Sequence, residues 1–105
     1  SFNDVPGYQV DMGKSYWGCL WEQGGDGMVQ QFNPKYVSRF LKEDQWNHYY
    51  VEARGNHIRA WLNGVSTIDV VHEGGRLNGK IGFELCNGPK QTKIEVRQLL
   101  VKVYE

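Results

Sequence analysis

The chain has 105 residues, with 12 basic and 12 acidic side chains, so its formal net charge at pH 7 is zero. This length is typical of one domain. The balanced charge gives no electrostatic footprint for nucleic acid or an anionic membrane. No apolar run approaches the ~18 residues of a membrane span. We therefore expect neither nucleic acid nor a membrane as a partner.

Short segments of β-forming residues, separated by turn residues, run along most of the chain. Because regular short strands with Gly- and Asn-rich punctuation favour a sandwich or barrel, the pattern predicts an all-β fold. The chain opens on Ser1 with neither an initiator Met nor a signal peptide, so we expect a processed or excised segment. The predicted strands are Tyr8–Met12, Tyr16–Trp21, Met28–Gln31, His48–Arg54, His57–Leu62, Val65–Val71, Lys80–Cys86 and Lys93–Tyr104.

One short helix is predicted over residues 34–41. Asn33 is a good N-cap residue, and Pro34 suits the first helical position. Val37, Phe40 and Leu41 repeat at the i, i+3, i+4 spacing of a helix with one apolar face. In the last predicted strand the apolar alternation changes phase near Arg97, which indicates a bulge. We expect the helix to cover one end of the sandwich.

The most informative block runs from Trp46 to Asp69. Apolar and polar residues alternate on both sides of Gly55-Asn56, and Asn63-Gly64 marks a second turn. Asn-Gly favours positive φ at both central positions, which is the geometry of a type I′ hairpin. The block therefore predicts antiparallel β-structure with one buried and one wet face.

Alternation also predicts which polar side chains share a face. If the side chains of one such face line a concave sheet, carboxylates and aromatic rings converge on a cleft. Such a cleft is suited to a sugar, since aromatic rings cover the apolar faces of a pyranose. Paired carboxylates also allow acid/base chemistry. The catalytic candidates are Asp11, Glu22 and Glu84, and the candidates for substrate contact are Gln9, Tyr16, Trp17 and Trp21.

Several of these residues have a structural alternative. Asp11 is equally suited to organising the turn before Gly13, and Trp17 and Trp21 are equally suited to the core. The three histidines lack metal-ligand spacing and are interpreted as surface residues, and no cofactor is predicted. Cys19 and Cys86 are too few for a disulfide framework, which leaves two buried thiols or a single bridge.

Two motifs resemble the 3-keto-disaccharide hydrolase domain family, which has a concanavalin/laminin-G-like β-sandwich. They are Gly7–Gly13 followed by Tyr16–Glu22, and Trp46-Asn47 followed by the segment ending in Trp61-Leu62-Asn63-Gly64-Val65. The resemblance implies a jelly-roll sandwich, a sugar or glycoside ligand, and a secreted or periplasmic location. It also implies that a base removes a proton next to the ketone and so expels the glycosidic oxygen. Since the family is nearly twice as long, we expect this chain to match its C-terminal half to two-thirds.

The departures from the family pattern lie where the chemistry is expected. The family's arginines after the first motif are absent, Glu84 stands for a usual glutamine, and Cys86 stands where a histidine is common. The scaffold motifs are intact, so the fold is expected to be retained around an altered site. The chain is then either a glycoside-cleaving domain or a non-catalytic sugar-binding module. A third alternative is a subunit whose free strand edges pair with another copy or with complementing N-terminal strands.

Overall fold

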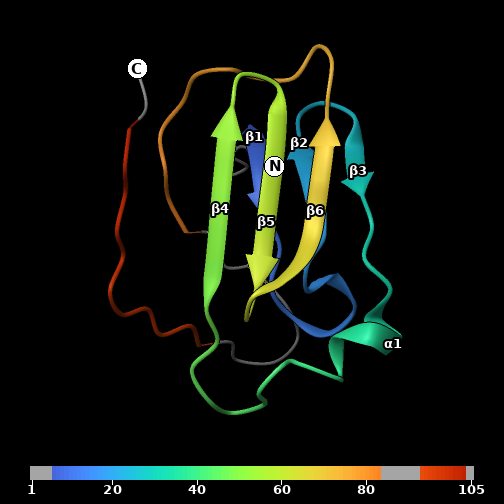
Figure 1. Cartoon of the computed structure of the whole chain (residues 1–105). Coiled ribbons are helices and arrows are strands. Elements are labelled where there is room, and N and C mark those ends of the chain that lie inside the picture. Colours follow the sequence, from blue (N-terminus) through green and yellow to red (C-terminus); the bar gives the residue numbers. More distant parts are fainter. Residues whose placement is uncertain (1–5, 84–92, 104–105) are drawn as a thin grey trace.

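The structure is a computed structural model that describes residues 6–83 and 93–103. Two three-stranded antiparallel sheets lie face to face (Figure 1). None of the helices within these ranges has the length and hydrophobicity of a membrane span. One sheet has the order β1 (Gly7–Val10), β2 (Leu20–Gln23), β3 (Gly27–Gln30), and the other has the order β4 (Tyr49–Arg54), β5 (His57–Leu62), β6 (Val65–Val71).

The core lies between the two sheets, as strand alternation requires. Leu20 from β2 is fully buried against Ile58 and Ala60 of β5 and Ile68 of β6. Tyr8, Val10, Val29 and Val70 pack around this cluster. The prediction of an all-β sandwich with one short helix is therefore confirmed.

Each sheet contains a bulge. In the first sheet Leu20 pairs with Gln30 but Trp21 pairs with Met28, so Val29 is the extra residue. In the second sheet Ala60 pairs with Ile68 but Trp61 pairs with Ser66. The extra residue, Thr67, is buried there, and its hydroxyl oxygen has no hydrogen-bond partner within the part of the chain that the structure describes. A bulge increases the local twist of the strand, which helps the short sheets wrap around a small core.

The second hairpin turn has the predicted geometry. Asn63 and Gly64 have φ values of 50° and 81°, so both central residues are in the left-handed region. The Asn63 side chain accepts a hydrogen bond from His48 N at 2.8 Å and donates to Phe40 O and to Asn47 Oδ1, each at 2.8 Å. The two parts of the second family-like motif, which contain Asn47 and Asn63, therefore meet through their amide side chains.

The helix is shorter than predicted. The α-helix α1 spans Pro34–Val37, and residues 38–40 continue as turns. Asn33 is its N-cap and accepts from Lys35 N at 3.0 Å, while Pro34 occupies the first turn as expected. A 3-10 helix, Lys14–Tyr16, replaces the start of the strand predicted over Tyr16–Trp21. The positive φ of Gly18, 81°, interrupts the chain there, and β2 starts only at Leu20.

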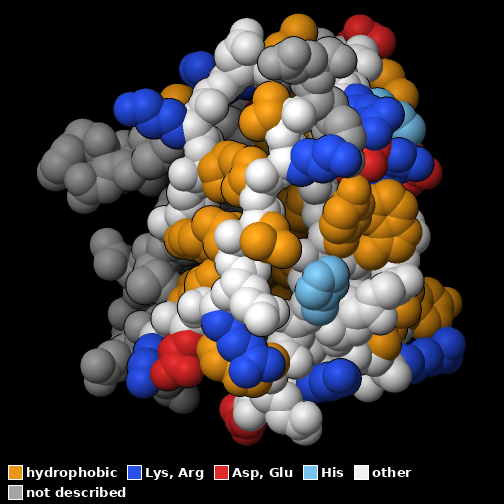
Figure 2. All heavy atoms as spheres, turned by 60° about the vertical axis from the view of Figure 1, so that its left-hand side comes forward, with side chains coloured by type: hydrophobic (Ala, Val, Ile, Leu, Met, Phe, Trp, Pro, Cys, Tyr) orange, Lys and Arg blue, Asp and Glu red, His pale blue; other side chains and the backbone are white. Residues whose placement is uncertain are grey.

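The two predicted C-terminal strands are not formed in the described residues. Residues 80–83 and 93–103 have no strand assignment, and the rest of both segments lies outside the described ranges. The predicted bulge near Arg97 therefore has no strand to interrupt, although Gln98 has a φ of 55°. Hydrophobic side chains stay at the surface on the side where β4 and the C-terminal segment lie (Figure 2). The most exposed large ones are Ile81, Leu100 and Val103 at 71%, 90% and 79%. Apolar alternation alone did not produce strand pairing here.

Candidate functional site

The pleat of β1 and β2 divides the predicted site residues between two faces. Tyr8 is paired with Glu22, and Gln9 is paired with Trp21. Because neighbouring residues on a strand point to opposite faces, Tyr8 and Glu22 lie on the core side with Leu20, while Gln9 and Trp21 lie on the outer side. Trp21 Nε1 donates to Gln23 Oε1 at 3.1 Å on that outer side. The predicted convergence of Glu22 with Gln9 and Trp21 on one cleft is therefore wrong.

Glu22 instead lies in a polar cluster at one end of the sandwich. The residue is only 6% exposed, and its Oε1 accepts a hydrogen bond from Asp26 N at 2.9 Å. His72, directly after β6, is hydrogen bonded through both ring nitrogens: Nε2 lies 2.7 Å from Asp26 Oδ2, and Nδ1 lies 2.5 Å from the Tyr8 hydroxyl oxygen. Ligand atoms of Glu22, Asp26 and His72 all lie within 4.8 Å of one another. We call Tyr8, Glu22, Asp26 and His72 the polar cluster.

Two glycines make room for the polar cluster. A Cβ at Gly25 would collide with the Glu22 carboxylate. A Cβ at Gly75 would collide with the Tyr8 hydroxyl and would lie 2.9 Å from His72 Nδ1. The backbone therefore approaches the cluster as closely as only glycine allows.

Burial and the nearby negative charges keep the Tyr8 hydroxyl protonated. Burial raises the pKa of Tyr8 above its usual range, and the nearby carboxylates of Glu22 and Asp26 raise it further. Tyr8 therefore stays neutral at physiological pH and can donate a hydrogen bond. The cluster thus combines a neutral donor, an imidazole and two carboxyl groups, which are groups that can give a proton to a substrate and take one from it.

The other predicted residues lie at the opposite end of β1. Asp11 follows β1 and is three residues after Tyr8, which pairs with Glu22. About 10 Å of extended chain therefore separates Asp11 from the Tyr8–Glu22 pair. Trp17 stacks on Tyr49 with ring centroids 6.0 Å apart. Tyr16 is 54% exposed. Asp11 and Glu22 therefore do not converge, and Glu84 lies outside the described residues.

Tyr49 ties the two sheets together at this end. Its hydroxyl accepts from Gly18 N at 2.7 Å and donates to Asp11 O at 2.9 Å. Burial raises the pKa of Tyr49 well above its usual range, so the hydroxyl stays protonated and keeps donating. The Asp11 backbone is held in place by this contact.

Replacing Tyr49 by Phe is expected to lower the free energy of unfolding by about 2 kcal/mol. The change removes both hydrogen bonds and leaves the part-buried Gly18 N–H and Asp11 C=O without this partner. Chemical denaturation followed by circular dichroism measures the effect. Tyr50→Phe is the matched control, because its hydroxyl is exposed and its contact with Glu52 is long, 3.4 Å, so a change within about 0.5 kcal/mol is expected. Equal effects of the two variants would contradict the assignment.

A hollow of about 650 Å³ lies beside α1. This volume is within the range of sites that hold small molecules. Among the described residues that line the hollow, Tyr16 is the only predicted contact residue and none carries a carboxylate. The lining residues are Ser15, Tyr16, Cys19, Met28, Gln31, Phe32, Asn33 and Pro34. Cys19 is a buried free thiol, as one of the two readings predicts, while Cys86 is outside the described residues.

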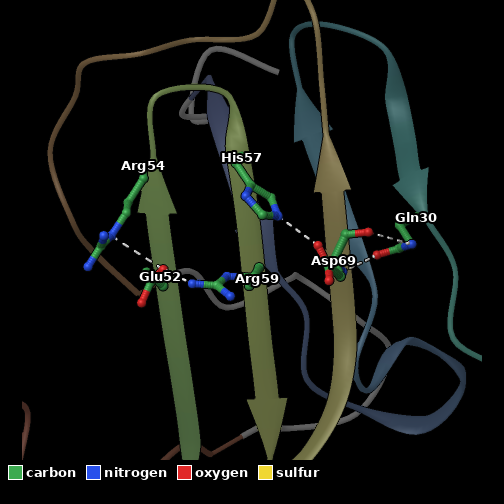
Figure 3. Close-up of polar contacts among 6 residues, drawn as sticks. All are labelled: Gln30, Glu52, Arg54, His57, Arg59 and Asp69. Atoms are coloured by element: carbon green, nitrogen blue, oxygen red, sulfur yellow. Dashed lines mark hydrogen bonds and ion pairs between the residues drawn. The ribbon is translucent and has the colours of Figure 1, made fainter.

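The outer face of the second sheet carries a separate ionic network (Figure 3). Glu52 of β4 pairs with Arg59 of β5, and Arg54 Nε lies 3.4 Å from Glu52 Oε1. Further along the face His57 Nε2 lies 2.7 Å from Asp69 Oδ1. The pairs Glu52–Arg59 and His57–Asp69 join neighbouring strands, whereas Arg54 and Glu52 both belong to β4. The network is separate from the polar cluster, which is on the core side.

The Glu52 contacts predict a loss of stability in acid. The hydrogen bond from Arg59, with the positive charges of Arg59 and Arg54, holds the pKa of Glu52 below its ordinary value of 4.5. A lowered pKa in the folded state contributes stability that is complete above pH 4.5 and is lost as the pH falls through the lower value. We expect Glu52→Gln to be less stable than the unmodified chain at pH 7 and to lose less stability between pH 5 and 3. Melting temperatures across this range check it, and parallel pH curves for the two proteins would contradict it.

Sequence reasoning found Glu22 but missed the rest of its surroundings. Tyr8 was not among the predicted site residues, and His72 was interpreted as a surface residue, although its side chain is only 13% exposed. Fifty positions separate Glu22 from His72, and no spacing rule connects them. The sequence did offer two weak signs of the polar cluster: Asp26 lies in the turn after Glu22, and His72 directly follows a predicted strand.

The comparisons with known proteins identify the family. No curated protein and no solved structure gave a significant match. A family model, described as a 3-keto-alpha-glucoside-1,2-lyase-like domain, matches residues 2–102. This match covers nearly the whole chain and confirms the resemblance carried by the motifs around Gly7–Glu22 and Trp46–Val65. The chain therefore belongs to the 3-keto-alpha-glucoside-1,2-lyase-like domain family.

Proposed function

We propose that the chain cleaves the glycosidic bond of 3-keto-glycosides by acid/base chemistry at the polar cluster. One observation carries this proposal: a histidine bonded through both ring nitrogens to a tyrosine and a carboxylate, beside the nearly buried Glu22. Such an arrangement fixes the tyrosine hydroxyl and keeps a base close to a proton donor. Membership of the family supports a carbohydrate-related role.

The reaction needs few groups because the ketone activates the substrate. A carbonyl at C3 acidifies the hydrogen on C2. In the proposed reaction Glu22 takes this proton, the C2–H electron pair forms a C1=C2 double bond, and the C1–O bond to the leaving group breaks. The Tyr8 hydroxyl, oriented by His72, gives a proton to the departing oxygen. The products are an unsaturated keto sugar and the free alcohol. Asp11 and Glu84 remain catalytic candidates that the proposal does not require.

The test is an assay of the purified chain on a 3-keto-α-glucoside and on the same glucoside without the ketone. We expect release of the alcohol from the ketone only, since the elimination requires an acidified C2–H. Glu22→Gln and Tyr8→Phe are each expected to lower kcat/KM by at least about 100-fold. Glu52→Gln, on the outer face, is the control and should leave the rate unchanged. Cleavage of the unoxidised glucoside, or full activity of Glu22→Gln, would refute the proposal.

A second candidate is non-catalytic sugar binding at the hollow beside α1. Its lining supports this function, because the described lining residues offer the aromatic rings of Tyr16 and Phe32 and the side-chain amides of Gln31 and Asn33. Calorimetric titration with glucosides tests it: binding without turnover that Tyr16→Ala removes would favour this candidate. A secreted or periplasmic location and self-association through free strand edges remain predictions. Light scattering over a wide concentration range measures the latter.

A further inference from the structure

We propose that Glu22, Asp26 and His72 form a binding site for a divalent cation of the zinc class. The three residues come from separate parts of the chain: β2, the turn between β2 and β3, and the position after β6. Their ligand atoms lie within 4.8 Å of one another, and within the described residues no other such group of three is found. The site therefore joins the two sheets at one end of the sandwich.

The donor set favours a borderline cation over a hard one. One imidazole nitrogen and two carboxylate oxygens are common zinc ligands, and a fourth position is left for water or another molecule. Calcium and magnesium prefer oxygen ligands alone. Metal–ligand bonds of about 2.1 Å at tetrahedral angles place the donor atoms about 3.4 Å apart. His72 Nε2 and Asp26 Oδ2, now 2.7 Å apart, would separate by less than 1 Å.

The surroundings support the ligand geometry. With the metal on Nε2, the ring proton of His72 is on Nδ1, and the Tyr8 oxygen, 2.5 Å away, accepts it. A partner on the second ring nitrogen is the usual way in which a ligating histidine is oriented. The Glu22 carboxylate is already held by Asp26 N. The Asp26 side chain is 73% exposed, so a cation can enter from that side.

The chain contains its own matched comparison on the outer face. His57 Nε2 and Asp69 Oδ1 are also 2.7 Å apart, but these side chains are 41% and 64% exposed, and they belong to no group of three donors in the described chain (Figure 3). A simple His–Asp pair on a sheet surface is thus available in the same protein. If a pair alone were enough for the cation, both sites would bind it.

The inference does not require the proposed function. A cation bound to Glu22 and His72 takes up the lone pairs that proton transfer would use. A cation and a reacting substrate therefore exclude each other at this cluster. Metal binding is therefore tested by binding and stability rather than by turnover, and either proposal can fail while the other stands.

The experiment uses the full chain, treated with a chelator and dialysed, with zinc chloride as the probe in calorimetry and thermal melts. We expect about one equivalent to bind and, at roughly 100 times the dissociation constant, a melting temperature about 10 °C higher. Magnesium chloride at the same concentration should give no shift. His72→Gln should remove the shift, and His57→Gln should keep it.

Asp26→Asn provides a second variant in case His72→Gln fails to fold, because the Asp26 side chain is mostly exposed. We expect it to weaken zinc binding at least about 10-fold. The proposal is overturned if the unmodified chain binds no zinc or if magnesium gives the same shift. It is also overturned if His57→Gln loses binding while Asp26→Asn keeps it.

Discussion

Replacing Asn63 by Ala is expected to lower the free energy of unfolding by about 3 kcal/mol. The side chain joins three segments: it accepts from His48 N and donates to Phe40 O and Asn47 Oδ1. Each hydrogen bond contributes about 1 kcal/mol, and two of the three are partly buried. The backbone adds to the cost, since φ is 50° and alanine is strained there. For a chain of this size the melting temperature should fall by roughly 12–24 °C.

Two further variants separate the side-chain contribution from the backbone contribution. Asn63→Gly accepts the positive φ but has no side chain, so it should recover about 1 kcal/mol relative to Ala. Asn56→Ala, in the neighbouring turn, is the matched control, because its amide makes one exposed contact with Glu73 at 3.1 Å. We expect that control to lie within about 1 kcal/mol of the unmodified chain. Full stability of Asn63→Gly would show that the amide network does not hold the three segments together.

The second sheet was the most predictable part of the fold. The predicted strands His57–Leu62 and Val65–Val71 have the bounds of β5 and β6. Local information is sufficient here, because Asn63-Gly64 sets the turn type and the alternation sets the buried face. Gly55-Asn56 likewise places the end of β4. Strand pairing between neighbours in the sequence therefore followed from residue patterns alone.

The C-terminal segments show where such patterns stop being sufficient. Residues 93–103 carry an apolar alternation that changes phase near Arg97, yet they have no strand assignment. A strand forms only when a partner edge is available, and that depends on tertiary contacts rather than on alternation. The expectation that carboxylates gather on one face failed for a related reason. Glu22 is on the core side because a strand residue that pairs with Tyr8 must share its face.

The candidate site depends on packing between the two sheets. Glu22 and Asp26 come from the first sheet and its turn, and His72 comes from the end of the second. The face-to-face arrangement of the sheets brings them together, so the spacing of these residues along the sequence gives no direct sign of the cluster. The same arrangement makes the cluster sensitive to the core beneath it, because Tyr8 contacts both His72 and the core residues.

Replacing Leu20 by Ala is expected to have the largest effect on stability, about 3–5 kcal/mol. Leu20 is fully buried and lies between the sheets against Ile58, Ala60 and Ile68. Truncation removes buried apolar surface and leaves a cavity that β-sheets joined by hydrogen bonds close only in part. Since small domains are stabilised by only about 5–15 kcal/mol, the variant should be close to unfolding at physiological temperature.

Leu77→Ala is the same chemical change at a position that is 67% exposed, and it should alter stability by less than about 0.5 kcal/mol. Urea denaturation of both variants measures the difference. Because Tyr8 packs on the Leu20 cluster and is bonded to His72, Leu20→Ala should also weaken any ligand or cation bound at the polar cluster, even where the chain remains folded. Similar stabilities of the two variants would show that the contact between the sheets is not the core, and the polar cluster would then lack the support that this packing gives it.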